Sequence, residues 1–367
     1  MWDRLSSLSN RTARLGRPTG KSVPHTDCVL PRAGRVHLDA PYAYSEMYIY
    51  LVTPAPPRSR KGNRVTALRW ARILRDLGHR VRVVQEYAGQ PCDLMVALHA
   101  RRSFDSIQRF HRTHPANPLI VALTGTDLYG DLQTDASAQR ALEMATRLIV
   151  LQSAALDALP TNMRGKAYVI HQSVRAPARK PRRRPDVFEV CVLGHLREVK
   201  DPFRAAEAVR LLPASSHITV LHAGAALDEQ MADHARREAA SNPRYQWLGE
   251  LPRWKAMRLL ARSRLLILTS IMEGGANVVS EAIAASTPVL SSRIPGSVGL
   301  LGEDYPGYFP VGDTAALAAL LQRAESDADF RESLDRSCRS LTWMVNPAKE
   351  RESWVSLLRE LFPESKQ

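Results

Sequence analysis

Two carboxylates separated by a glycine-rich segment stand out in the second half of the sequence. The segment EGGANVVSEA places Glu273 and Glu281 eight residues apart, with Gly274, Gly275 and Asn277 between them, directly after an apolar run. A glycine-rich turn from a strand into a helix presents free backbone N–H groups, and the helix N-terminus stabilises an anion by about 0.3–1 kcal/mol. Glu281 would lie about two turns into that helix, where its carboxylate can accept hydrogen bonds from a ribose diol. A solvated turn between a strand and a helix would explain the same spacing.

A second segment, GHLREVKDP, ends another apolar run and carries two cations three residues apart, Arg197 and Lys200. Both would reach the same loop mouth, where each can pair with a diphosphate through charge-assisted hydrogen bonds worth about 1.5–3 kcal/mol. An exposed basic loop is the alternative. A third segment, TPAPPRSRKGNRV, places Gly62 and Asn63 at a turn from a strand into a helix. It lacks both the G-x-G-x-x-G and the GK[ST] pattern of phosphate-binding loops.

Short apolar runs alternate with amphipathic segments along most of the chain, and buried parallel strands have this composition. The first helix is expected over residues 62–79, with Val65, Leu68, Ile73 and Leu77 near one face. The alternation predicts an α/β protein with two doubly wound, Rossmann-like parallel sheets that carry helices on both faces. We expect the strands within residues 48–54, 80–85, 93–99, 118–124, 147–152, 167–172, 188–194, 217–224, 245–249, 264–270, 288–292 and 308–311.

A basic, proline-rich stretch separates the two series of strands. We expect a disordered tail over residues 1–46, an N-terminal domain over 47–178, a linker over 179–186 and a C-terminal domain over 187–346. The amphipathic segment 347–362 follows a complete second half, and we expect this helix to fold back onto the first domain. Two such halves would enclose a cleft that faces the carboxyl ends of their strands.

Charge and cysteine content narrow the class of protein further. The 367 residues carry a net charge of +14, but only 6% of them are aromatic, unlike a surface on which bases stack. We therefore expect no nucleic-acid partner and favour a small anionic substrate. No apolar run approaches the ~20 residues of a membrane span. The four cysteines, Cys28, Cys92, Cys191 and Cys338, are too dispersed for a zinc site or a disulfide framework, and a cytoplasmic location is expected.

Together these motifs resemble the family 4-like glycosyltransferases of the two-domain GT-B fold, over nearly all of residues 47–362. The strand end G-x-L-x-x-x-K (Gly194, Leu196, Lys200), the E-x7-E pair Glu273 and Glu281, and then EAIAASTPVLSS and IPGS occur in the order typical of that family. Longer runs, including ALHARRS, ALTGTDLY, VLGHLREVKDP and RIPGSVGLLGEDYPGYFPVGD, resemble the selenosugar synthases of selenoneine biosynthesis. Those enzymes join selenophosphate to the anomeric carbon of UDP-N-acetylglucosamine or UDP-glucose.

The resemblance implies a role for each part of the donor site. Arg197 and Lys200 would hold the UDP diphosphate, Glu281 would take the ribose hydroxyls, and Glu273 would face the donor sugar. His195 departs from the family pattern, which usually has arginine at this position, and HQSV at 171–174 replaces an asparagine-glycine turn. The donor-binding residues are then Gly62, Asn63, Arg197, Lys200, Gly274, Gly275, Asn277, Val278, Val279 and Glu281.

The implied acceptor is small and anionic, and its selenium is already a strong nucleophile. Such an enzyme needs cations that position the acceptor more than it needs a strong base. We expect the acceptor anion at Arg64, Arg101, Arg102, Thr124 and Thr126, which stand near strand ends of the first half. Candidate catalytic residues are Glu273, His99 and Asp127. A buried, hydrogen-bonded histidine, a solvated arginine and a helix cap are the alternatives for His99, Arg101 and Asp127.

Neither a metal nor a cofactor is expected, because no D-x-D motif lies beside the donor loop and the cations with the helix dipole can neutralise the UDP leaving group. The expected partners are a UDP-sugar and selenophosphate, with a functional link to the selenophosphate-producing and ergothioneine-like selenoneine synthase enzymes and without integral membrane contact. Three alternatives stay open: a GT-B enzyme with a hydroxyl acceptor (lipid-linked, polysaccharide or small molecule), a GT-B sugar-nucleotide isomerase, and a basic binding protein. The membrane-associated variant of the first alternative rests on Arg64, Arg69, Trp70, Arg72 and Arg75 of the first helix.

Overall fold

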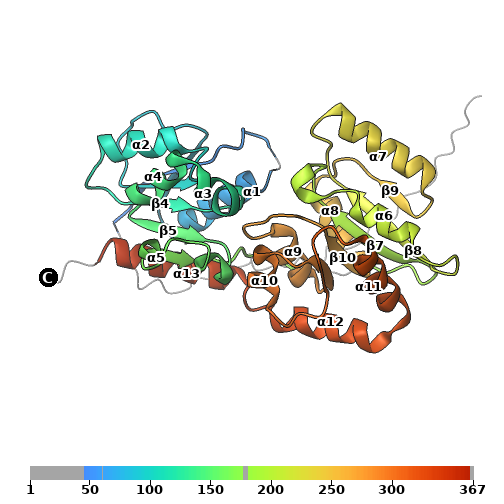
Figure 1. Cartoon of the computed structure of the whole chain (residues 1–367). Coiled ribbons are helices and arrows are strands. Elements are labelled where there is room, and N and C mark those ends of the chain that lie inside the picture. The colour runs from blue at the N-terminus through green and yellow to red at the C-terminus, as the bar shows by residue number, and fades with distance from the viewer. Residues whose placement is uncertain (1–44, 60, 177–180, 364–367) are drawn as a thin grey trace, which may run out of the picture. The chain divides into compact units, whose positions relative to one another are not determined.

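Two parallel sheets of six strands organise the protein (Figure 1). The computed structural model describes residues 45–59, 61–176 and 181–363. We call residues 45–176 together with the last helix the first lobe, and residues 181–346 the second lobe. The expected α/β class with two doubly wound parallel sheets is confirmed, and every expected strand is present. The predicted tail up to residue 44, and residues 179 and 180 of the predicted linker, lie outside the described residues.

The first lobe places its strands in the order β2-β1-β3-β4-β5-β6. Its strands are β1 Tyr48–Val52, β2 Arg80–Val84, β3 Leu94–Leu98, β4 Leu119–Ala122, β5 Arg147–Val150 and β6 Ala167–Val169. Its helices are α1 Gly62–Asp76, α2 Phe104–Thr113, α3 Leu132–Thr134, α4 Ala136–Met144, α5 Thr161–Arg164 and α13 Pro347–Leu361, with the short π-helix η1 Asp127–Asp131 and the 3₁₀ turn η2 Ser153–Leu156.

The second lobe has the strand order β12-β11-β10-β7-β8-β9. Its strands are β7 Phe188–Leu193, β8 Ile218–Ala223, β9 Tyr245–Trp247, β10 Leu265–Leu268, β11 Val289–Ser292 and β12 Tyr308–Phe309. Its helices are α6 Arg204–Arg210, α7 Glu229–Ser241, α8 Arg253–Arg262, α9 Asn277–Ala285, α10 Pro295–Leu301, α11 Thr314–Ser326 and α12 Ala328–Ser340, with the 3₁₀ turn η3 Glu198–Lys200.

The strand orders determine where a ligand can sit. In each sheet the chain starts in an inner strand, adds strands on one side of it and then crosses to its other side. The loops diverge where the order changes direction and leave a crevice at the carboxyl ends of the strands. In the first lobe this point lies between β1 and β3, and in the second lobe it lies between the paired strands β7 and β10. The segments with Arg197 and Glu273 follow β7 and β10 directly. Both are therefore placed at the edge of the sheet where a crevice forms.

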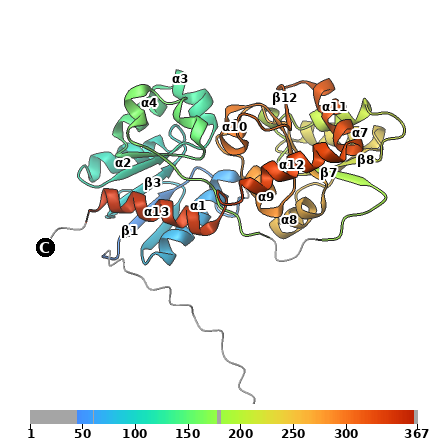
Figure 2. The same ribbon diagram turned by 90° about the horizontal axis from the view of Figure 1, so that it is seen from below.

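Helix α13 packs on the first lobe beside α1, as Figure 2 shows. The indole rings of Trp70 and Trp354 meet edge to face at 5.2 Å, and neither side chain is exposed. The face that α1 turns to the core consists of Ala67, Trp70, Ala71 and Leu74, so the expectation for this helix was wrong at its first turns. Because Trp70 is buried, it cannot belong to a membrane-facing surface, and the membrane-associated alternative loses its aromatic residue.

Candidate functional site

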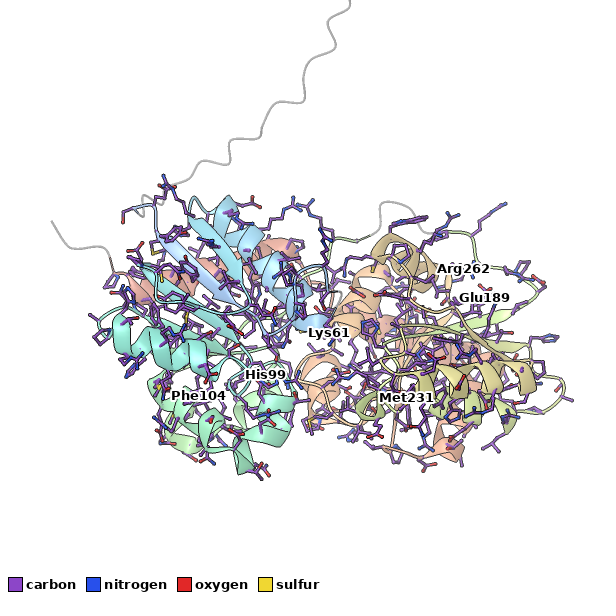
Figure 3. The ribbon with its side chains drawn as sticks, turned by 90° about the horizontal axis from the view of Figure 1, so that it is seen from above. Lys61, His99, Phe104, Glu189, Met231 and Arg262 are labelled. Atoms are coloured by element: carbon purple, nitrogen blue, oxygen red, sulfur yellow. The ribbon has the colours of Figure 1, made fainter. Side chains whose placement is uncertain are left out.

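A cavity of about 560 Å³ opens where strand ends of both sheets meet, and most of the predicted site residues line it. Lys61 and His99, which contribute to its first-lobe side, are labelled in Figure 3. The predicted residues on its walls are Gly62, Asn63, His99, Arg102, Thr124, Thr126, Arg197, Lys200, Glu273, Gly275, Asn277, Val278 and Glu281. Five predicted residues do not line it, namely Arg64, Arg101, Asp127, Gly274 and Val279.

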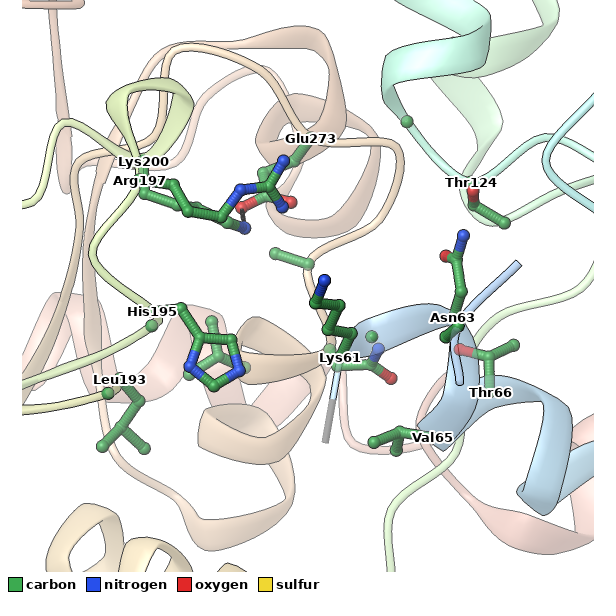
Figure 4. Close-up of a pocket in the computed structure, with 18 of the residues that line it drawn as sticks. Lys61, Asn63, Val65, Thr66, Thr124, Leu193, His195, Arg197, Lys200 and Glu273 are labelled. Carbon is green, nitrogen blue, oxygen red and sulfur yellow. Dashed lines mark hydrogen bonds and ion pairs between the residues drawn. The ribbon is translucent and has the colours of Figure 1, made fainter. Parts of the chain in front are cut away.

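Glu273 and Lys200 form one wall of the cavity, with Arg197 beside them (Figure 4). The ammonium of Lys200 forms an ion pair with the Glu273 carboxylate, which also accepts a hydrogen bond of 2.8 Å from the Ser270 hydroxyl. The Thr269 hydroxyl donates to the carbonyl of Lys200 at 2.8 Å, so the loops after β7 and β10 hold each other. A fixed cation and a fixed carboxylate therefore stand side by side at the crevice.

The N-terminus of helix α9 faces the same cavity. Asn277 and Val278 occupy its first two positions, where helical N–H groups have no partner within the helix. The N–H of Val279 donates instead to the Ala276 carbonyl at 2.9 Å, and its side chain is buried. The amides that the helix end can offer to an anion are thus those of Asn277 and Val278, whereas the predicted donor-binding residue Val279 uses its N–H within the turn.

Glu281 lies one turn further along α9 and pairs with Arg253 of helix α8 at 2.6 Å. Burial raises the pKa of Glu281, and the positive charge of Arg253 works against that rise. The apolar side chains of Leu227, Leu251 and Met257 also line the cavity and form an apolar recess in its wall. A carboxylate that can accept from hydroxyl groups and an apolar surface therefore belong to the same cavity as the helix N-terminus.

His99 follows β3 with a left-handed backbone, at a φ of 72°, which is unusual for a residue with a side chain. Its Nδ1 accepts from the backbone N–H of Arg102 at 3.3 Å, so its Nε2 carries the proton of the neutral ring and lies 3.1 Å from the Thr126 hydroxyl. Burial lowers the pKa of His99, although the nearby Asp127 carboxylate opposes the effect. His99 therefore donates its Nε2–H from a neutral ring to Thr126 at the cavity wall.

Asp127 is fully buried and serves the backbone around the site. Its carboxylate accepts from the N–H groups of Thr124 at 2.9 Å, Gly125 at 2.8 Å and Ala100 at 3.1 Å. These three bonds hold the loops after β3 and β4 together and leave the carboxylate turned away from the cavity. Asp127 therefore positions the backbone around His99, and its carboxylate accepts from residues that precede the π-helix η1 and does not cap that helix.

Two predicted acceptor cations also lie away from the cavity. The guanidinium of Arg101 pairs with Asp131 at 2.8 Å and is 42% exposed, while Arg64 is half-buried on α1 outside the cavity wall. Arg102, Thr124 and Thr126 remain as the predicted acceptor residues that line it. The sequence could not separate Arg101 from Arg102, because adjacent residues of a loop differ only in the direction of their side chains.

Lys61 and His195 line the cavity but were not among the predicted site residues. Figure 4 shows Lys61, which precedes α1, reaching into the cavity between His195 on one side and Thr124 on the other. The Nδ1 atom of His195 accepts from the N–H of Ala225 at 3.1 Å. Burial lowers the pKa of His195, and of the charges around it Glu250 opposes this shift while Lys200, Arg197 and Lys61 add to it. The sequence held a signal for each of them: Lys61 belongs to a basic run in a turn, and His195 stands where the resembling family usually has arginine.

The loops of the two lobes touch through glycines. A Cβ atom on Gly274 would lie 2.5 Å from the backbone nitrogen of Gly125, and one on Gly125, whose φ is 142°, would lie 2.8 Å from the nitrogen of Gly274. Both neighbours are main-chain atoms and cannot rotate away. The segments 124–126 and 273–275 can therefore approach this closely only because neither glycine carries a side chain.

Charge is distributed unevenly over the cavity. On its described walls the first lobe contributes Lys61 and Arg102 but no acidic residue, whereas all three carboxylates, Glu250, Glu273 and Glu281, come from the second lobe.

Within the described residues no group of three His, Cys, Asp or Glu side chains is placed to hold a metal ion. In that same part of the chain, no helix combines the length and the apolar character that crossing a membrane requires.

Residues 175–340, which span most of the second lobe, match the family of glycosyl transferases group 1. The fold is similar to HepE from Anabaena, solved with UDP and glucose, at a TM-score of 0.69 and 15% identity over 86% of this chain and 100% of that one. A glycosyltransferase from Rickettsia africae ESF-5 has a TM-score of 0.68 and 13% identity over 88% of this chain and 100% of that one. For sucrose-phosphate synthase from Thermosynechococcus elongatus the TM-score is 0.68 and the identity 14%, over 87% of this chain and 100% of that one. No curated protein matches in sequence. These likenesses confirm the GT-B fold expected from the sequence.

Proposed function

We propose that the protein is a glycosyltransferase that takes its sugar from a UDP-sugar. The observation that carries this proposal is that two cations, Lys200 and Arg197, the N-terminus of α9, Glu281 and apolar side chains all line one cavity. Cations and backbone amides suit a diphosphate, a carboxylate suits ribose hydroxyls, and apolar side chains suit a base. The match of the second lobe to glycosyl transferases group 1 and the UDP in the similarly folded HepE support the same donor.

Each part of the donor has a complementary partner. The diphosphate would lie against Lys200 and the free amides of Asn277 and Val278, where charge-assisted bonds are the strongest available. The ribose hydroxyls would donate to Glu281, and the base would enter the recess of Leu227, Leu251 and Met257. Lys200 would then divide its hydrogen bonds between the diphosphate and Glu273, which keeps both groups in register.

For the acceptor we propose selenophosphate, as the resemblance to selenosugar synthases implies. The first-lobe wall supports an acceptor of this kind, because it offers the cations Lys61 and Arg102 with the hydroxyls of Thr124 and Thr126. No described acid of that lobe lines the cavity, and the Nδ1 atom of His99 is already engaged. An acceptor that needs a base finds none on this wall, whereas a selenium anion needs only to be held in line.

The proposed step is a substitution at the anomeric carbon. Selenium donates an electron pair to form the C–Se bond, and the bond from the anomeric carbon to the diphosphate oxygen breaks with its electron pair on UDP. Lys200, Arg197 and the end of α9 stabilise the negative charge that develops on that oxygen. His99 Nε2–H donates to the Thr126 oxygen, and the Thr126 hydroxyl is then placed to donate to the sugar or the acceptor.

Mass spectrometry of reaction mixtures tests this proposal. The protein is incubated with UDP-N-acetylglucosamine or UDP-glucose and with selenophosphate, and thiophosphate serves as a second anionic nucleophile. We expect UDP and a sugar that carries selenium, each dependent on the protein. Hydrolysis of the UDP-sugar without a selenium product, or no turnover of selenophosphate, would exclude this acceptor. Transfer to an added alcohol instead would identify a hydroxyl acceptor.

The acceptor wall can be tested with two arginines of the same lobe. Arg102→Ala removes a cation from the cavity and should raise the KM for selenophosphate about 10-fold or more, with a smaller effect on the KM for the UDP-sugar, because ground-state anion binding is lost. Arg112→Ala, on the exposed side of α2, is the matched control. Equal kinetics for the two variants would remove Arg102 from the acceptor site.

A further inference from the structure

Arg69 of helix α1 makes contacts that reach from the first lobe to the donor loop of the second. Its Nε atom lies 3.0 Å from both carboxylate oxygens of Glu350, on α13. One terminal nitrogen donates to the side-chain carbonyl of Asn277 at 3.2 Å, and the other donates to the side-chain carbonyl of Gln172 at 3.1 Å. All three nitrogen atoms of this guanidinium thus serve residues that are far from Arg69 in the sequence, and the side chain is only 17% exposed.

Gln172 adds a second connection to the same loop. Its amide nitrogen donates to the carbonyl of Gly275 at 3.0 Å, while its carbonyl accepts from Arg69 and, at 3.3 Å, from the Thr66 hydroxyl. The Gln172 side chain therefore has a defined orientation, with oxygen towards α1 and nitrogen towards the donor loop. Both Asn277 and Gly275 are held from the first lobe.

Glu350 anchors this arrangement where the chain passes between the lobes. Its carboxylate, 1% exposed, also accepts from the Trp70 indole at 2.8 Å and from the backbone N–H of Ser173 at 3.0 Å. Beside it, the N–H of Val174 donates to the carbonyl of Val345 at 2.9 Å. This bond joins the two segments through which the chain passes from one lobe to the other. The arginine fork is thus fixed by the connecting segments themselves.

We propose that Arg69, with Gln172 and Glu350, is a positioning residue that gives the donor loop its binding conformation only when the lobes are closed. Because Arg69 engages the oxygen of the Asn277 amide, the nitrogen of that amide is left to point towards the cavity, near Gly62. Because Gln172 engages the Gly275 carbonyl, that peptide is oriented as well. Separation of the lobes must break both contacts, so closure and donor binding stabilise each other.

The inference rests on the proposed donor, and UDP affinity measured by calorimetry tests it without any acceptor. Arg69→Gln should weaken UDP binding about 10-fold or more. The matched control is Arg72→Gln on the same helix, whose guanidinium is 62% exposed and pairs only with Asp76 among the described residues, and it should bind UDP as the unchanged protein does. Equal affinity of the two variants would overturn the inference. Failure of the unchanged protein to bind UDP would instead refute the proposed donor.

Two further variants separate positioning from folding, since Arg69→Gln leaves the buried Glu350 with one partner fewer. Gln172→Met keeps the Arg69–Glu350 pair and removes the bond to Gly275, so it should weaken UDP binding at an unchanged melting temperature. In a double-mutant cycle, Arg69→Gln should weaken UDP binding less in an Asn277→Ala background than in the unchanged protein, because Asn277→Ala has already removed the contact between Arg69 and Asn277. Equal losses in both backgrounds, or a Gln172→Met variant with full UDP affinity, would show that these residues only stabilise the fold.

Discussion

Adding one methyl group to Gly274 tests whether the close contact between the lobes matters for binding. The new Cβ atom would stand 2.5 Å from the nitrogen of Gly125 and 2.6 Å from its Cα, both in the backbone. Carbon atoms rest at about 3.5–4.0 Å from their neighbours, so the two loops would have to separate by about 1 Å. Overpacking of this kind costs about 1–3 kcal/mol. Because the overlap exists only while the loops touch, the cost falls on the closed form.

We therefore expect Gly274→Ala to weaken UDP binding by roughly 5- to 150-fold, the equivalent of that cost, with little change in melting temperature because each lobe keeps its own core. Isothermal calorimetry and thermal unfolding measure the two quantities. Gly165→Ala is the matched control, since its Cβ would meet no atom within 4 Å. A Gly274→Ala variant that binds UDP as tightly as the control would refute this account of the contact.

Three other changes have expected outcomes. Lys200→Ala should lose about 1.5–3 kcal/mol of UDP binding by calorimetry, whereas Lys255→Ala, at the surface over Trp254, should lose none; equal affinities would exclude the diphosphate assignment. His222 is buried, and burial lowers its pKa to about 4, so between about pH 6.5 and 4 the unfolded chain binds one more proton than the folded protein. The free energy of unfolding should therefore fall by up to about 3 kcal/mol as the pH drops through this range. A His222→Gln variant should show a weaker pH dependence in urea titrations, and an identical profile would contradict this. Trp354→Ala should destabilise the first lobe by about 3–5 kcal/mol, and the 57% exposed Trp343→Ala should stay within about 0.5 kcal/mol.

The strands could be predicted from the sequence because buried parallel strands are continuous apolar runs. LLIL of β10 and LMVAL of β3 have no polar residue and are buried throughout. The core face of α1 could not be predicted, because Val65 and Leu68 line the cavity while the small Ala67 and Ala71 pack inside. Hydrophobicity alone does not tell a cavity wall from a core.

That the predicted donor-binding residues share one cavity could be foreseen for a local reason. Arg197 and Lys200, like Glu273 and Glu281, come from single segments that follow apolar runs, so their spacing along the chain already relates them in space. Contacts across the lobes have no such signal. Arg69 and Glu350 are 281 residues apart, and only the folded chain brings them together.

The packing of α13 on the first lobe affects the order in which a newly made chain can fold. The second lobe is a continuous stretch inserted between the first lobe's sheet and its last helix, so it can fold as soon as its own residues have emerged. The core around Trp70 waits for α13, whose Glu350 follows 280 residues later. At synthesis rates of about 5–20 residues per second, that delay is roughly 15–55 s. The first lobe is therefore completed after the second, and its apolar face beside α1 stays uncovered until α13 has been made.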